Sequence, residues 1–308
     1  MRQVLEWPAL PLDGWQDTYR TLHMYTQVVG KIRLALTPAM NHWWHVPLYV
    51  TARGLTTTPI PYGDRAFEMA FDGFESALLV TATDGSIRRV PLGTTVSAFY
   101  EQVLADLADI GIRVQIGPMP VEVVRPVRFD ADDRAVRFDP EAVRRCFRVL
   151  SRVDQVLKRF RAGFAAKSSP VHFFWGSFDL AVTRFSGRPA PARTGDRINA
   201  CAYNAELSSV GFWPGGEIPG GVRIDGPAFY AYSYPKPEGL EQAPIRPAGA
   251  YWHAALGEFI LPYEAVRRSS DPARTILEFA DSAFQAGARL AGWPPEAVGL
   301  PPAVARCL

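Results

Sequence analysis

Two long segments carry apolar residues at every third or fourth position, the spacing that gathers them on one face of a helix. The first runs from residue 15 to 36 and stops at Thr37-Pro38, with Asp13 placed to cap its start. The second runs from 139 to 165 and opens on Asp139-Pro140, because proline is favoured in the first turn. A shift of 128 residues superimposes the two stripes: Trp15, Tyr19, Leu22, Tyr25, Val29, Ile32 and Leu36 fall on Val143, Phe147, Leu150, Val153, Leu157, Phe160 and Phe164.

Shorter apolar segments between turn residues predict strands after each of these helices. We expect strands at 66–71, 76–82, 87–91, 112–116, 121–124, 200–210, 228–234 and 251–261, and further helices at 94–110 and 271–291. Each long helix is therefore followed by a run of strands and then by a second helix.

One stretch of the chain occurs twice. Residues 171–191, shifted back by 130, align with residues 41–61, so that His172 falls on His42 and a Pro-x-Pro ends both copies. Each copy reads as a His-led aromatic run, a strand and a polar turn. The sequence therefore predicts a tandem duplication.

These patterns together predict an α+β fold with mostly antiparallel sheet, built from two internally duplicated helix–strands–helix units in a pseudo-twofold arrangement. We expect the first repeat half at residues 1–118, a connector at 119–138, the second half at 139–293 and a C-terminal tail at 294–308.

Composition narrows the class of protein. A net charge of +2 gives no general attraction to nucleic acid or to anionic lipid, and the arginines of the 139–165 segment are typical of a solvated helix face. Three scattered cysteines indicate a reducing compartment, and the N-terminal residues lack the apolar core of a signal peptide. We expect a cytoplasmic protein with neither nucleic-acid nor membrane partners.

The repeated aromatic stretch supplies the main candidate site. If the halves pack about a twofold axis, His42 and His172 take equivalent places in a central cleft. Polar and charged side chains on or near the same strands would add specific contacts. The candidate residues from these strands are His42, His172, Trp43, Trp44, Trp175, Asp179 and Arg184. The alternative is that these aromatics form the core between the halves.

Three further features of the second half add candidates. Tyr230, Tyr232 and Tyr234 alternate, so they share one sheet face, either as a stacking platform or, as we favour, beneath a helix. The loop at 211–221 is rich in Gly and Pro and presents Trp213 and Glu217, either to a site or as a structural loop. Glu258 lies within an apolar strand, where a carboxylate needs an arginine partner or a cavity.

Metal and nucleophile chemistry find little support. His42 and His45 have an H-x-x-H spacing, but residues three apart on a strand point to opposite faces, so we expect no metal site. No G-x-S-x-G motif is present, and no cysteine has a histidine at a recognisable spacing. No cofactor follows from the residues.

Several segments resemble one known family. These are Trp7-Pro8-x-Leu10, the run at 41–44, Gly211-Phe212-Trp213-Pro214-Gly215-Gly216, the segment 227–235 and the segment 256–266. They are similar to the DUF5996 family of uncharacterised bacterial proteins over most of the chain. The resemblance implies a cytosolic protein with the full-length family architecture, and it implies no activity or catalytic residues.

The sequence thus predicts a protein that binds a small molecule in an aromatic-lined cleft between two repeat halves. As an enzyme it would use acid–base chemistry through His42, His172 and Glu258, with Trp43, Trp44, Trp175, Asp179, Arg184, Trp213, Glu217 and Tyr232 binding the ligand. The alternative is a protein–protein interaction or structural module without catalytic activity.

Overall fold

The computed structural model describes residues 7–191 and 197–294, and it has an α+β fold with two six-stranded antiparallel sheets. The predicted tail at 294–308 lies almost wholly outside the described residues. The first half holds the helices α1 (Gln16–Leu36) and α2 (Val96–Asp109) and the strands β1 (Tyr49–Val50), β2 (Gly54–Thr56), β3 (Ile60–Tyr62), β4 (Arg65–Asp72), β5 (Ala77–Ala82) and β6 (Ile87–Pro91).

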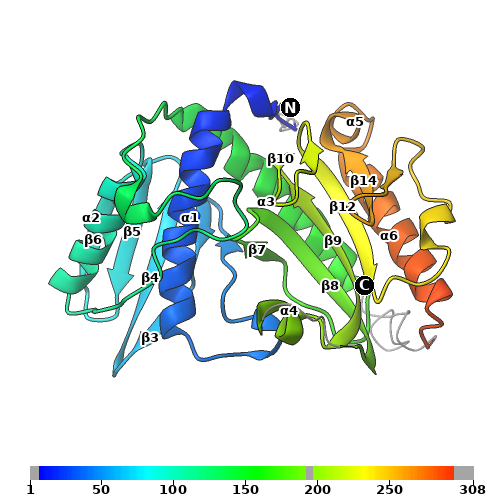
Figure 1. The fold of residues 1–308 in the computed structure, drawn as a ribbon, viewed down its shortest axis with the longest axis horizontal. Coiled ribbons are helices and arrows are strands. Elements are labelled where there is room, and N and C mark those ends of the chain that lie inside the picture. Colours follow the sequence, from blue (N-terminus) through cyan, green and yellow to red (C-terminus); the bar gives the residue numbers. More distant parts are fainter. Residues whose placement is uncertain (1–6, 192–196, 295–308) are drawn as a thin grey trace, which may run out of the picture.

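The second half repeats the same kinds of element. Its helices are α3 (Pro140–Ala162), α4 (Arg197–Ala202), α5 (Tyr263–Arg267) and α6 (Pro272–Leu290). Its strands are β7 (His172–Phe174), β8 (Asp179–Pro189), β9 (Ala205–Trp213), β12 (Ala228–Tyr234), β13 (Tyr251–His253) and β14 (Glu258–Pro262), with a separate hairpin of β10 (Gly216–Glu217) and β11 (Arg223–Ile224). Figure 1 shows the two sheets side by side, with α1 in front of the first and α3 and α6 behind the second.

Helix starts follow local chemistry in three of the four predicted helices. The Thr95 side chain accepts a hydrogen bond from the Ala98 amide at the start of α2. The Asp139 side chain accepts a hydrogen bond from the Glu141 amide at the start of α3, and the Asp271 side chain accepts one from the Arg274 amide at the start of α6. The predicted cap of α1 is wrong: Asp13 lies in a preceding 3-10 turn (Leu12–Gly14), and Trp15 occupies the cap position without a side-chain hydrogen bond.

The two sheets meet at one place. Leu48 and Phe173 exchange both backbone hydrogen bonds, at 2.9 Å each, so β1 and β7 lie next to each other. Outward from this contact, the first sheet has the strand order β1-β2-β4-β5-β6 and the second has the order β7-β8-β9-β12-β14. Duplication itself stays a prediction.

The register of the two sheets differs from the one the sequence suggested. Val50 pairs with Leu55 at the turn after β1, and Phe174 pairs with Asp179 at the turn after β7, so an alignment of these two turns sets positions 124 apart rather than 130. In that alignment His172 falls on Leu48 and not on His42.

Two predicted strands are absent, and other predicted segments are turns or begin later in the chain. The run that begins at His42 forms a 3-10 turn (Asn41–Trp43), because His42 and Trp43 have positive φ angles of 54° and 59°. The segments 112–116 and 121–124 carry no strand, and hydrogen bonds from elsewhere hold part of this connector. The start of the predicted strand at 200–210 is the end of α4, and β9 begins only at Ala205.

No helix among the described residues is both long enough and apolar enough to cross a membrane.

Candidate functional site

A pocket of about 710 Å³ lies over one face of the second sheet. This volume is within the range of small-molecule sites. Side chains from β7, β8, β9, β12 and β14 form its floor. Its walls come from the 41–46 segment, the connector at 121–122, α4 and the β10–β11 hairpin.

Strand alternation decides which residues reach this floor. On β8, Asp179 and every second residue to Phe185 line the pocket, because successive side chains point to opposite faces. Arg184 therefore faces the other way, where its guanidinium lies 3.4 Å from the centre of the Phe160 ring and donates to the Phe160 carbonyl. The Arg184 side chain packs under α3 and does not line the pocket.

The centre of the floor is made of small residues. Ala181 pairs with Gly211 on the neighbouring strand, and Tyr230 pairs with Gly211 from the next. A Cβ on Gly211 would come within 2.2 Å of the Tyr230 ring and 2.4 Å of the Leu180 carbonyl oxygen. The missing side chain lets the Tyr230 ring lie across β9.

Tyr230 thereby reaches a carboxylate two strands away. Its hydroxyl donates to Asp179 Oδ2, while the Ser177 hydroxyl donates to Asp179 Oδ1. Asp179 is only 6% exposed, and burial raises its pKa. Burial, with Asp179 nearby, also raises the pKa of Tyr230 well above its ordinary value. Burial therefore disfavours the charged form of each group.

A second tyrosine lies beside the first. The Tyr230 and Tyr232 rings stack at 6.2 Å and 17°, and the Tyr232 and Tyr203 hydroxyls lie 2.9 Å apart. This face is not the helix-covered one that we favoured for the alternating tyrosines. The α6 helix packs on the opposite side of β12, where a Cβ on Gly287 would meet Ser233 Oγ at 2.2 Å.

The walls are held by contacts from α1. Gln27 Nε2 donates to the Val121 carbonyl at 2.8 Å, and the Val121 amide donates to Gln27 Oε1 at 2.9 Å, which fixes the connector beside the pocket. The Trp175 indole packs on Gly30 of α1, where a Cβ would approach it to 2.3 Å. Its Nε1 donates to the Val46 carbonyl at 2.9 Å.

His42 is held by groups outside the floor. Its Nδ1 lies 3.2 Å from the Ala202 carbonyl oxygen, and its Nε2 lies 2.8 Å from the Lys167 ammonium, which can only donate. Nδ1 therefore carries the proton in this arrangement. Burial, together with the positive charge of Lys167, lowers the pKa of His42.

His172 is enclosed by aromatic rings. The rings of Trp44, Tyr49 and Phe174 meet it edge-on, and it is 1% exposed. Its Nε2 has no hydrogen-bond partner among the described residues. Burial lowers the pKa of His172 to about 3, with smaller contributions from Arg33 and Arg161. This imidazole is neutral at physiological pH.

The predicted candidates divide into two groups. Those that line the pocket are His42, Trp43, Trp44, His172, Trp175, Asp179, Trp213, Tyr232 and Glu258. Arg184 and Glu217 do not: Arg184 lies under α3, and Glu217 is exposed on β10 while its neighbour Ile218 lines the pocket.

Sequence reasoning left out several lining residues, among them Glu122, Ser177 and Tyr203. It named Tyr230 as one of the alternating tyrosines but kept only Tyr232 among the ligand-binding residues. The sequence holds no signal for Glu122, because an irregular connector brings this residue to the pocket.

In the described part of the chain, no group of three or more His, Cys, Asp and Glu side chains is arranged to hold a metal ion.

The comparisons with known proteins add a family and no activity. No curated protein and no solved structure matches the chain. A family model described as a family of unknown function, DUF5996, matches residues 7–300, and the chain therefore belongs to the DUF5996 family.

Proposed function

We propose that this protein binds a small organic molecule in the pocket over the second sheet. The observation that carries the proposal is the floor itself, where the buried carboxylate of Asp179 and the Tyr230 hydroxyl lie inside a 710 Å³ space walled by aromatic rings. A few polar groups placed among apolar walls are typical of small-molecule sites. The same rings packed as core would leave no such space.

Binding is favoured over the acid–base enzyme of our first hypothesis. His172 lies on β7 and Glu258 on β14, at opposite edges of the floor, with β8, β9 and β12 between them. Four strand spacings separate their backbones by roughly 19 Å, too far for a directly hydrogen-bonded pair. His42 is already engaged through both ring nitrogens. The geometry thus supports recognition more strongly than proton transfer between these residues.

A filled pocket tests the proposal. Ala181→Phe places a ring at the centre of the floor, whereas Ala105→Phe makes the same change at an exposed position on α2. The probe is N-phenyl-1-naphthylamine, which is nearly neutral at pH 7 and fluoresces strongly in apolar sites. We expect saturable binding by the wild-type protein and by Ala105→Phe, and at least tenfold weaker binding by Ala181→Phe. Equal binding by both variants would contradict the proposal.

A further inference from the structure

Among the described residues that line the pocket, the charged residue types are all acidic. Glu122, Asp179 and Glu258 are acidic, and no lysine or arginine is found among the described residues that line it. Both lining histidines, His42 and His172, favour the neutral form because burial lowers their pKa. The Lys167 ammonium does not line the pocket, and it lies 2.8 Å from His42 Nε2 and 5.3 Å from the centre of the Trp44 ring. The described lining therefore offers acids and neutral imidazoles to a ligand.

Asp179 is the most enclosed of these acids. Its carboxylate accepts hydrogen bonds from the Ser177 and Tyr230 hydroxyls, which are neutral donors. Burying a carboxylate with neutral partners alone is costly, and a cation nearby would offset much of that cost. A positively charged group on the ligand would supply it.

The rings around Asp179 suit the same kind of group. Tyr230 and Tyr232 stack beside each other on the floor, and Glu258 lies close enough to raise the pKa of both. Cations bind favourably to the faces of tyrosine and tryptophan rings, most strongly where water is excluded. Trp213 also lines the pocket and adds a further ring.

A second observation points independently to a bound molecule. His172 Nε2 is buried and has no hydrogen-bond partner among the described residues, yet the side chain lines the pocket. A buried polar atom without a partner is rare in folded proteins. A polar group on the ligand would satisfy it at the edge of the floor opposite Glu258.

Resting on the proposed function, we infer that the ligand is an organic cation, an amine or quaternary ammonium with an apolar body. The cationic group lies between Asp179 and the Tyr230 and Tyr232 rings. The body extends along the apolar wall of Trp44, Phe174 and Phe185.

Three matched probes separate charge from shape: 4-phenylbutylamine, 4-phenylbutanol and 4-phenylbutyrate, titrated calorimetrically at pH 7. We expect the amine to bind at least tenfold tighter than the alcohol, and the carboxylate to bind most weakly. Asp179→Asn should reduce the preference for the amine to less than threefold while leaving the alcohol unaffected. Glu258→Gln, at a half-buried position, serves if Asp179→Asn does not fold, and Glu101→Gln on α2 is the charge-matched control.

The outcomes separate the two proposals. Equal affinity for amine and alcohol, or tightest binding of the carboxylate, would overturn the cation and leave the pocket standing. Binding of the naphthylamine probe without binding of the amine, the alcohol or the carboxylate would also overturn the cation and leave the pocket standing. Equal naphthylamine binding by Ala181→Phe and Ala105→Phe would remove the pocket function, and the cation with it.

Discussion

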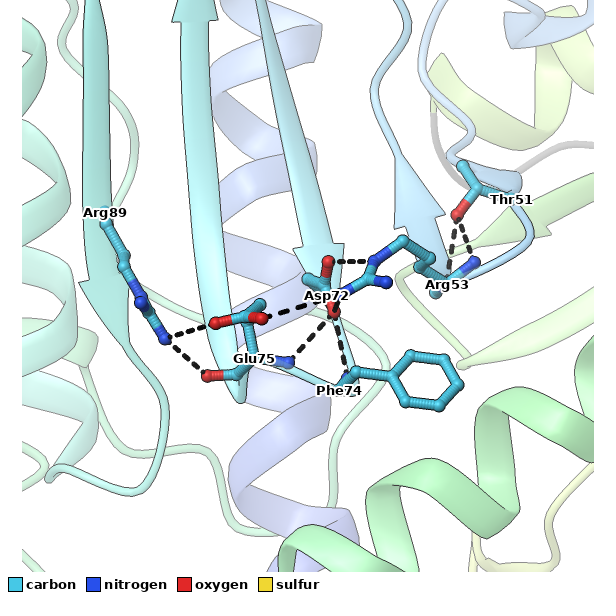
Figure 2. Close-up of polar contacts among 7 residues, drawn as sticks. Thr51, Arg53, Asp72, Phe74, Glu75 and Arg89 are labelled. Atoms are coloured by element: carbon cyan, nitrogen blue, oxygen red, sulfur yellow. Dashed lines mark hydrogen bonds and ion pairs between the residues drawn. The ribbon is translucent and has the colours of Figure 1, made fainter.

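Each sheet contains a buried aspartate near a turn. One aspartate pairs with a charged side chain, and the other has hydroxyl partners. Asp72, at the end of β4, is 4% exposed, and Asp179, at the start of β8, is 6% exposed. Asp72 forms an ion pair with Arg53, and it also accepts hydrogen bonds from the amides of Phe74 at 2.9 Å and Glu75 at 3.0 Å (Figure 2). Asp179 accepts only from hydroxyl groups among the contacts described above.

These different partners shift the pKa values of the two aspartates in opposite directions. Burial alone would raise the pKa of both acids. At Asp72 the hydrogen bonds from Arg53 and the two amides outweigh it and lower the pKa. At Asp179 burial dominates and the pKa is raised. The first sheet therefore gives its buried acid a positively charged partner and two amides, whereas the second gives its acid hydroxyl partners and leaves it facing a pocket. That difference separates a structural turn from a candidate site.

The largest expected effect comes from Gly211, the residue that lets Tyr230 reach Asp179. Gly211→Ala places a Cβ against the Tyr230 ring and the Leu180 carbonyl, and a backbone atom cannot move away cheaply. We expect the free energy of unfolding to fall by about 3 kcal/mol, measured by urea denaturation.

Gly226→Ala is the matched control, since a Cβ there meets nothing within 4 Å. An equal loss in the two variants would show that Gly211 is not required for the close approach of Tyr230.

The next largest effect is expected at Asp72, the buried acid of the first sheet that pairs with Arg53. Asp72→Ala removes the partner of Arg53 and of two turn amides, and we expect a loss of about 2 kcal/mol at pH 7. Because the pKa of Asp72 is lowered in the folded protein, its stabilisation is present above the unfolded value of about 3.9 and is lost as the pH falls below it. The difference from wild type should therefore shrink in acid.

Glu75→Ala, at a half-exposed side chain in the same cluster, is the control and should change little (Figure 2). A loss at Asp72→Ala that stays constant from pH 7 to pH 3 would contradict the ion-pair account.

The elements that local pattern controls were predictable. The helices α1, α2, α3 and α6 lie close to the predicted ranges, because apolar spacing sets which face is buried. The run at 41–46 was not predictable as a turn, since contacts from Lys167 and Ala202, far along the chain, hold His42 with positive φ. Sequence alone does not show such long-range constraints.

The site was predictable in part, for a similar reason. Arg184 could have been set aside from the sequence, because it is an odd number of residues from Asp179 and so falls on the other face of one strand. The pairing of Asp179 with Tyr230 could not be foreseen, since it depends on the register of three strands and on the space above Gly211. Alternation assigns faces, and only register assigns neighbours.

The smallest effect is expected at Asp179, the buried acid with hydroxyl partners. Asp179→Asn keeps the shape and removes the charge, and we expect its stability at pH 4 to lie within about 1 kcal/mol of wild type. Since the pKa of Asp179 is raised, its contribution to stability is complete below the unfolded value of about 3.9 and is lost as the pH rises through the folded value. Asparagine has no such loss, so the variant should gain on wild type between pH 4 and pH 8 in urea denaturation. If wild type instead gained with rising pH, the chain itself would supply a positive partner for Asp179. The contrast with Asp72 would then disappear, together with the need for a cationic ligand.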